Sequence, residues 1–324
     1  MVGDDFSRLE TSRVSLKLIP PYFMRRYGVR QVFSTAGAET VLKYEMEITY
    51  KKTIAEGLRL FELNRFDQLY INNEVPDSIA DELAFRTGQV FFPLQVLVDF
   101  AGRYVSVYNL VQIRERWTVL KKELLEFFAG EEVETYFGYQ ETVLMDQDKI
   151  NDIFGKDILI RAYFAGLYQN YVAEKELDSL LYFPLTGHAA PVLFSVKETL
   201  VPHYNSSGQL EIIHKGSADD DRSIADILRY DDYATSRDDD QSLEKIKADY
   251  KARYALNAET RSIEAMEASW MMFLDREEIT SISMYEISGL DELTEKEVAA
   301  VNAAEEKKDQ PAGPGAKFMK ILFG

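Results

Sequence analysis

Cysteine is absent from this chain of 324 residues. Its absence excludes disulfide bonds, thiolate metal sites, thiol nucleophiles and iron–sulfur clusters. A glycine-rich phosphate-binding loop is also missing, because Gly57, Gly88 and Gly102 each stand alone among bulkier residues. No apolar run approaches the roughly 20 residues that a membrane-spanning helix requires. We therefore expect no nucleotide chemistry, no cofactor and no membrane insertion.

Basic residues are in deficit, with 37 Lys and Arg against 55 Asp and Glu and a net charge of −18. A field of this sign repels the phosphate backbone of nucleic acids and anionic membrane surfaces, so neither is an expected partner. Residues 1–5 lack the basic region and apolar core of a signal peptide. We expect a soluble protein, cytoplasmic by default and periplasmic if a leader has been removed.

Histidine is scarce, with only His188, His203 and His214 in the chain. His203 and His214 flank a predicted hairpin turn that contains Ser206, which suggests a serine nucleophile with a histidine base. Such a site needs a nucleophile elbow or an oxyanion donor pair, and no Gly-x-Ser-x-Gly occurs in the sequence. We therefore interpret these histidines as strand residues with ordinary partners.

Residues 246–287 carry the clearest structural pattern. Polar and apolar side chains alternate along Ile246–Leu256, and the chain turns at Asn257–Arg261 and again at Asp275–Glu278. A period of two is typical of a strand with one solvent-exposed side, so the pattern predicts an antiparallel three-strand meander. The expected inward-facing side chains are Ala248, Tyr250, Ala252, Tyr254, Leu256, Met266, Ala268, Trp270 and Met272.

Residues 1–108 predict a β-rich part. Val41–Thr53 alternates throughout, and Leu58–Ile71 is its expected antiparallel neighbour. The basic and aromatic segment Tyr22–Tyr27 is of a type that binds single-stranded nucleic acid. The net charge of the chain favours the alternative that it is a connecting segment. The remaining expected elements are a strand over Thr11–Ile19 that stops at Pro20, a helix over Ser78–Thr87 with Asp77 as N-cap and Gly88 as stop, and a hairpin over Pro93–Val107.

Residues 109 to about 190 predict a helical block. Val111–Phe128 follows a helical stripe that ends at Gly130. Further helices are expected over Glu131–Met145 and Asp148–Phe154, and Lys156–Tyr171 is an additional candidate. From residue 191 the β character returns, with a hairpin over 192–214, a helical turn over 223–228 and the meander. A capped helix over 290–306 follows.

Together these patterns predict the α+β class. We expect a large curved antiparallel β-sheet, the helical block packed against it, and a C-terminal helix plus tail. The chain divides into residues 1–108, 109–190, 191–309 and a linker and tail over 310–324. The two β-rich parts are expected to form one continuous domain, because no Pro/Gly-rich linker flanks the helical block. They are expected to close over a shared apolar interior with no reactive centre.

The nearest approach to a metal loop runs from Asp146 to Asp157. Asp146 and Asp148 match the first and third calcium ligands, but Ile150 supplies no oxygen at the fifth position and Asn151 replaces the glycine. We interpret this stretch as a capped turn between helices. The aspartates at 219–221 and 238–240 have no regular ligand spacing and are interpreted as solvated loops. No residue is predicted to be catalytic, cofactor-binding or metal-binding.

The last residues form the one candidate binding segment. A Pro/Gly-rich linker over 311–315 precedes an apolar and slightly basic octapeptide, which would be costly to leave in water. We expect it to dock by strand addition or as a short helix in a groove, on its own domain or on a partner. The candidate contact residues are Lys317, Phe318, Met319, Lys320, Ile321, Leu322 and Phe323.

Several short segments carry a resemblance. They are Leu69-Tyr70-Ile71-Asn72-Asn73, Pro93-Leu94-Gln95-Val96, Gly102 and Arg114-Glu115-Arg116-Trp117. At these positions the chain resembles uncharacterised bacterial proteins, some of which accompany contractile secretion or toxin-delivery systems. The resemblance covers about the middle third of the chain and carries over no catalytic residues. It implies an assembly component or adaptor in preference to an enzyme.

Three functions remain open. The first is a non-enzymatic adaptor or scaffold that binds a protein partner or a second copy of itself, with the tail as contact. The second is a half-barrel that carries a small apolar ligand, suggested by aromatic strand faces such as those of Tyr44, Tyr50 and Trp270. The third is a hydrolase that uses two carboxylates, which would have to share one cleft.

Overall fold

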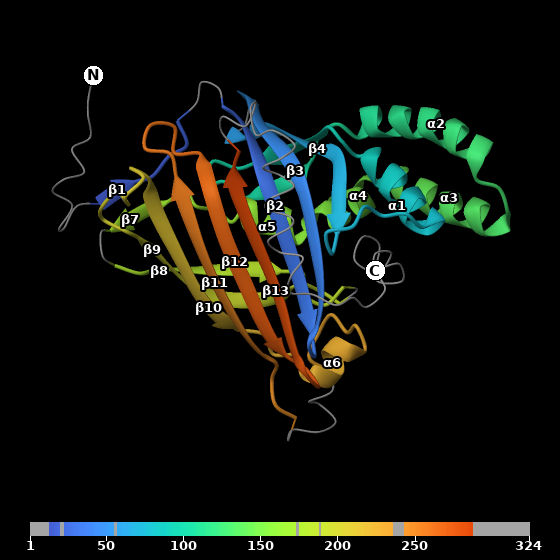
Figure 1. The fold of residues 1–324 in the computed structure, drawn as a ribbon. Helices are drawn as coiled ribbons and strands as arrows, with labels where there is room; N and C mark the ends of the chain where they lie inside the picture. The colour runs from blue at the N-terminus through green and yellow to red at the C-terminus, as the bar shows by residue number, and fades with distance from the viewer. Residues whose placement is uncertain are drawn as a thin grey trace.

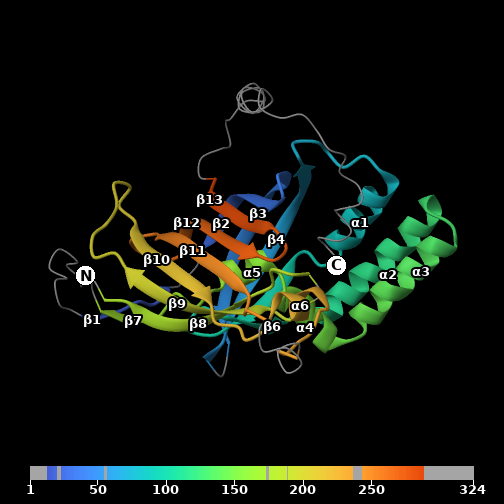
Figure 2. The same cartoon turned by 90° about the horizontal axis from the view of Figure 1, so that it is seen from below.

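The computed structural model describes residues 13–19, 23–54, 57–172, 175–187, 189–235 and 243–287. One large antiparallel sheet dominates the fold, and helices α1, α2 and α3 lie to one side of it (Figure 1). Seen from below, the sheet curves around α5 (Figure 2). This is the α+β architecture with a curved antiparallel sheet that the sequence predicts.

The N-terminal half of the sheet contains one strand that the alternation pattern did not predict. Tyr22–Tyr27 is not a connecting segment, because its described part opens a long strand in which Tyr27 and Val29 face the core. Gly28 lies between them where a Cβ would approach the Tyr285 ring to 3.1 Å. The strands are β1 (Arg13–Ser15), β2 (Met24–Thr35), β3 (Ala38–Thr53), β4 (Arg59–Ile71), β5 (Leu94–Val98) and β6 (Tyr104–Val107).

The helices confirm most of the predicted block but shift its limits. Ser78, and not Asp77, caps α1, and Gly88 lies inside that helix instead of ending it. The helices are α1 (Ile79–Gln89), α2 (Leu110–Phe127), α3 (Glu131–Leu144), α4 (Gln147–Gly155) and α5 (Ile158–Tyr163). The block therefore ends at Tyr163 and not near residue 190. Beyond it, β7 (Asn170–Val172) pairs with β1, and β8 (Leu177–Phe183) joins the large sheet.

The C-terminal half of the sheet follows the prediction closely. The hairpin around residues 205–208 and the three-strand meander are both present and antiparallel. Helix α6 (Ile224–Leu228) begins with a capping box in which Ser223 and Asp226 bond reciprocally. The strands are β9 (Val192–Leu200), β10 (Leu210–Ala218), β11 (Lys247–Leu256), β12 (Ile263–Phe273) and β13 (Glu277–Glu286).

The two β-rich parts join in one sheet of 11 strands, in the order β6-β5-β4-β3-β2-β13-β12-β11-β10-β9-β8. The junction is the antiparallel pair β2–β13, in register from Thr35 opposite Glu278 to Tyr27 opposite Glu286. Strands that are far apart in the sequence therefore form one continuous surface. The predicted joining of the two parts in one sheet is confirmed.

The core lies between the inner face of this sheet and the segment that contains α5. Tyr250, Tyr254 and Trp270 are almost fully buried, as their alternation predicts, and they pack beside Tyr27 and Phe183. Removing so much apolar surface from water is the main term that stabilises the fold. None of the helices in the described ranges is long and apolar enough to span a bilayer. The predicted helix over 290–306, the linker and the tail lie outside the described residues.

Candidate functional site

Two ionisable side chains lie inside the core, which corrects the expectation of a purely apolar interior. Glu198 in β9 and His214 in β10 are directly opposite each other across the strand pair. Both are 0% exposed, and Oε2 of Glu198 lies 3.6 Å from Nε2 of His214. A carboxyl and an imidazole are the ordinary components of an acid/base pair, but 3.6 Å exceeds hydrogen-bond distance, and Nε2 of His214 has no hydrogen-bond partner among the described residues.

The hydrogen bonds around Glu198 come from Tyr171 and Gln169, which lie after α5 in the chain. The Tyr171 hydroxyl lies 2.8 Å from Oε2 of Glu198 and 2.9 Å from the carbonyl oxygen of Leu167. One phenol has a single proton to donate. The Tyr171 hydroxyl therefore shares its proton between two acceptors, Oε2 of Glu198 and the carbonyl oxygen of Leu167. The amide of Gln169 lies 3.4 Å from both carboxyl oxygens and completes the surroundings.

Burial shifts the pKa of both groups toward their neutral forms. Desolvation raises the pKa of Glu198 above its ordinary value, against the opposing hydrogen bonds of Ser179 and Tyr171. Desolvation also lowers the pKa of His214 to about 3. A charged form of either group would have to be stabilised without water, which a protein interior does poorly. Burial thus favours the neutral form of both groups.

Tyrosine hydroxyls connect the sheet to α5 around this pair. The Tyr254 hydroxyl donates to the carbonyl oxygen of Ala162 at 2.9 Å and lies 3.2 Å from the Tyr250 hydroxyl. On the neighbouring part of the sheet, Tyr27 donates to the carbonyl oxygen of Ile263 at 2.6 Å and lies 3.1 Å from the Tyr163 hydroxyl. Each buried phenol thus has a partner, which is the condition for burying a polar group without a large penalty.

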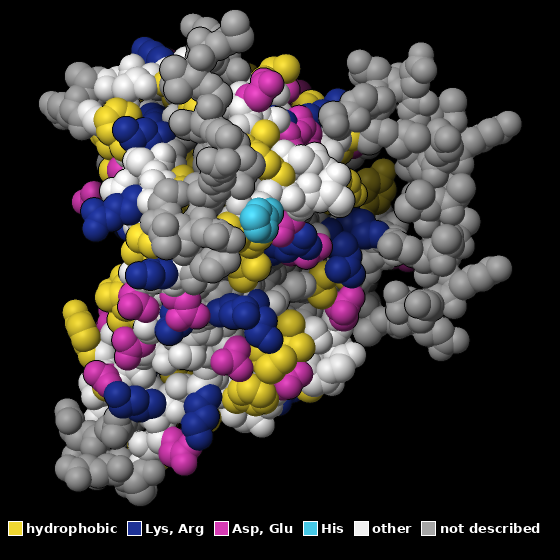
Figure 3. Space-filling view, turned by 90° about the vertical axis from the view of Figure 1, so that its left-hand side faces the viewer, with side chains coloured by type: hydrophobic (Ala, Val, Ile, Leu, Met, Phe, Trp, Pro, Cys, Tyr) yellow, Lys and Arg dark blue, Asp and Glu magenta, His cyan; other side chains and the backbone are white. Residues whose placement is uncertain are grey.

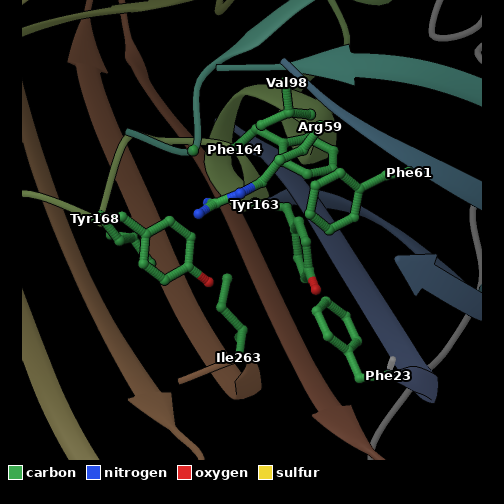
Figure 4. Close-up of a pocket in the computed structure, with 10 residues that line it drawn as sticks. Phe23, Arg59, Phe61, Val98, Tyr163, Phe164, Tyr168 and Ile263 are labelled. Atoms are coloured by element: carbon green, nitrogen blue, oxygen red, sulfur yellow. The ribbon is translucent and has the colours of Figure 1, made fainter. Parts of the chain in front are cut away.

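A small cavity lies near this network, beneath β4 and the turn between β5 and β6. Its volume is about 10 Å³, the space of about one water molecule. Arg59 extends among the rings of Phe61, Tyr163, Phe164 and Tyr168 that surround it (Figure 4). The Tyr168 hydroxyl donates to the carbonyl oxygen of Arg261 at 3.1 Å. The aromatic interior is therefore filled, and this cavity is too small for an apolar ligand.

The interior pair can hold protons but has no room for a substrate. Glu198, His214, Tyr171, Tyr250 and Tyr254 are each 1% exposed or less. A catalytic acid or base must reach its substrate directly or through one water, and ligand sites are usually clefts of a few hundred cubic ångströms. The geometry suits a structural network that fixes the position of α5 against the sheet.

The candidate site residues identified from the sequence do not come together in one site. Oδ1 of Asp146 accepts the backbone N–H groups of Asp148 and Lys149, so this stretch is the capped turn that we predicted. His203 is exposed near the hairpin tip, whereas His214 is buried. Within the described residues, no group of three or more His, Asp or Glu side chains is arranged to hold a metal ion.

The remaining candidates from the sequence are the two aspartate runs and the C-terminal tail. Oδ1 and Oδ2 of Asp220 accept the guanidinium N–H groups of Arg222 at 2.9 and 2.7 Å, and Asp221 pairs with Lys245. Asp220 is therefore an anchored loop residue and not a freely solvated charge. Residues 238–240, His188 and the contact segment Lys317–Phe323 lie outside the described residues.

The alternation along β9 and β10 holds a signal for the buried pair, although the sequence prediction of an apolar interior did not include it. The inward positions of β9 are Val192, Phe194, Val196, Glu198 and Leu200, and those of β10 include Leu210, Ile212 and His214. A carboxyl or imidazole in such an apolar series is predicted to be buried. Alternation along a strand does not predict the contact between Tyr171 and Glu198, because Tyr171 belongs to another part of the chain.

Comparison of the chain with known protein families finds no matching family, and comparison with curated proteins finds no significant match. The assignment of function therefore depends on the geometry described above.

Proposed function

We propose that this chain is a non-enzymatic protein-binding component of a bacterial assembly, an adaptor or scaffold, and that Lys317–Phe323 is a contact with its partner. The observation that carries the proposal is the sealing of the interior. The acid/base pair of Glu198 and His214 is fully buried, and the cavity in the aromatic core holds about one water molecule. The chemistry-bearing groups have no access to a substrate, so the outer surface is left to carry the function.

The outer surface supports a binding role. Helices α2 and α3 stand beside the sheet (Figure 1). These helices and the residue that follows α3 expose several large apolar side chains. Exposed apolar side chains that gather on one unit are typical of surfaces that contact other proteins. These side chains are Val111 (61% exposed), Val119 (60%), Phe127 (73%), Tyr139 (70%) and Met145 (64%).

The side of the molecule that carries β8, β9 and β10 exposes charged side chains of both signs. Figure 3 shows basic and acidic side chains interspersed there, with hydrophobic areas between them. Lys197 lies opposite Asp178 and forms an ion pair with Glu176. A surface of mixed sign lacks the single-sign field that attracts nucleic acid. This mixture supports a protein as the partner.

The two other functions have less support. An apolar carrier needs a lined cavity, and the interior cavity of about 10 Å³ is far below the size of a small ligand. A carboxylate hydrolase needs two carboxyl groups in one open cleft. The open hollow at the turn between α3 and α4 is lined by three carboxylates, Glu141, Asp146 and Asp148. Glu141 accepts hydrogen bonds from Lys121 and Trp117, and Asp146 accepts the first backbone N–H groups of α4, so two of the three have structural partners.

Deleting residues 316–324 tests the proposal. The truncated chain is expected to keep the circular dichroism spectrum and thermal melting temperature of the full chain, because the described core contains none of these residues. Association is expected to weaken, measured by affinity capture with mass spectrometry and by sedimentation velocity. An unchanged set of partners and an unchanged sedimentation profile would contradict the assignment of the tail as a contact.

A pair of matched variants separates the apolar from the basic side chains of the tail. One variant carries Phe318→Ser and Phe323→Ser, and the other carries Lys317→Ser and Lys320→Ser. Buried aromatic anchors usually supply most of the binding free energy, while rim charges mainly affect the rate of association. The phenylalanine variant is therefore expected to lose most of the association and the lysine variant only part of it.

A further inference from the structure

Arg59 in β4 is a buried cation without an anionic partner. The residue is 7% exposed, and no carboxylate of the described residues lies within ion-pair distance of its guanidinium group. The nearby Asp99 accepts the backbone N–H of Arg103 with Oδ1 at 2.8 Å. A buried charge that is unpaired strongly destabilises the folded chain unless another group compensates it.

The existing contacts of Arg59 compensate this charge only partly. Nη1 and Nη2 donate to the carbonyl oxygens of Phe100 and Leu18 over long distances of 3.4 and 3.5 Å. The guanidinium carbon lies 4.8 Å from the centre of the Phe100 ring and 5.8 Å from that of Tyr168. Nε is buried and has no hydrogen-bond acceptor among the described residues. The N–H of Arg59 Nε is therefore a strong donor without an acceptor among the described residues.

The cavity described above lies beside this donor. Figure 4 shows the Arg59 side chain extending between Tyr168 and the cluster formed by Phe61, Tyr163 and Phe164. The volume of about 10 Å³ admits a single small species and excludes polyatomic anions such as phosphate or sulfate.

We propose that the cavity bounded by Arg59, Tyr163, Tyr168 and the surrounding phenylalanines is a binding site for one monoatomic anion, a halide of the size of chloride. The anion accepts the N–H of Arg59 Nε and neutralises the buried guanidinium. A single water molecule would accept the same hydrogen bond but would leave the positive charge uncompensated. Because the site joins β4, the β5–β6 turn and the segment after α5, its occupancy stabilises the folded chain by mass action.

Thermal unfolding in different sodium salts tests the site. At constant ionic strength, replacing gluconate with chloride is expected to raise the melting temperature of the full chain by about 2–3 °C once chloride exceeds its dissociation constant tenfold. Sulfate should give no comparable shift at the concentration where chloride saturates. Equal melting temperatures in chloride and gluconate would overturn the proposal.

Three variants separate the site from general salt effects. Arg59→Gln removes the charge and is expected to abolish the difference between chloride and gluconate, whereas Arg59→Lys should keep part of it. Arg26→Gln is the control, because Arg26 is solvent-exposed and paired with Glu45. Its melting temperature should respond to chloride as the unaltered chain does. An Arg59→Gln chain that keeps the full chloride response would also overturn the proposal.

Bromide gives a direct readout that does not depend on the stability of a variant. In crystals of the full chain grown or soaked in sodium bromide, an anomalous peak is expected within hydrogen-bond distance of Arg59 Nε. A water molecule at that position without an anomalous signal would contradict the site.

Discussion

Oε2 of Glu198 lies 3.6 Å from Nε2 of His214, and neither side chain is exposed to solvent. Were both groups charged, their attraction would have to offset the desolvation of two ions, which it rarely does inside a protein. When both groups are neutral, the desolvation free energy of the pair is much smaller, and the two side chains still fill their place in the core. The free energy of unfolding should therefore depend on pH through this pair.

His214 should make the protein less stable as the pH falls. Its pKa is about 3 in the folded chain, against an ordinary value of 6.5, because burial disfavours the imidazolium. The unfolded chain takes up the proton first, so this contribution is complete above pH 6.5 and is lost as the pH falls toward 3. Between pH 7 and pH 5 the loss is about 2 kcal/mol. Urea unfolding of the wild type and His214→Gln at several pH values measures it as the difference between the two.

His203→Gln is the control for the His214 measurement, because His203 is exposed. Its free energy of unfolding should follow the wild type across the same pH range. If His214→Gln keeps the same pH dependence as the wild type between pH 7 and pH 5, the imidazole is not held neutral by burial. The side chain would then have to be reached by water in solution.

Glu198 should make the protein less stable as the pH rises. Burial raises its pKa, so its contribution is complete below the ordinary value and is lost as the pH rises through the raised value. Glu198→Gln keeps the shape and an oxygen that accepts the Tyr171 hydroxyl but cannot ionise, so we expect it to equal or exceed the wild-type stability at pH 8. Glu198→Ala, which leaves Tyr171 and Gln169 without this partner, should cost about 1–3 kcal/mol. Denaturant titrations at pH 5 and pH 8 compare the three chains.

Much of the fold could be predicted from local alternation. β4 alternates less regularly, but β3 and β11 each keep one apolar and one polar face over ten residues, so their type follows from the sequence. β8 does not, because Leu180-Leu181-Tyr182-Phe183 is a continuous apolar run that fits a buried helix equally well. Its strand conformation is set by pairing with β9, which is tertiary information.

The candidate site was predictable only in part. Glu198 and His214 occupy inward positions that alternation identifies, so their burial could have been foreseen. Their environment could not, because Tyr171 and Gln169 reach Glu198 from the segment after α5. The Arg59 cavity has the same origin, since its lining comes from the residue before β2, from β4, β5 and the β5–β6 turn, from α5 and the segment after it, and from β12. A site assembled from distant segments leaves no spacing signature in the sequence.

Arg25 should stabilise the junction between the two halves of the sheet. Its guanidinium pairs with Glu286 of β13, lies 3.6 Å from Glu264 of β12 and donates to Ser262 at 2.8 Å. The Arg25 side chain is 11% exposed, so Arg25→Ala should cost about 2–3 kcal/mol of unfolding free energy. Chemical denaturation measures the loss.

The neighbouring Arg26 is the matched control for Arg25. It pairs with Glu45, and the Arg26 and Glu45 side chains are 49% and 37% exposed. Exposed ion pairs contribute about 0–1 kcal/mol, so Arg26→Ala should have a small effect. Equal losses for Arg25→Ala and Arg26→Ala would mean that the junction does not depend on the buried contacts.

Gly102 should tolerate no side chain, for two separable reasons. Its φ of +90° lies in a region that L-residues rarely adopt, and a Cβ would lie 2.7 Å from Cδ2 of Tyr168. Gly37 has a similar φ of +83°, but a Cβ there meets nothing within 4 Å. Gly37→Ala should therefore report the backbone strain alone, about 1 kcal/mol, and Gly102→Ala should cost about 2–4 kcal/mol. Equal losses in denaturant unfolding would show that Tyr168 moves away freely and that the ring does not pack against this turn.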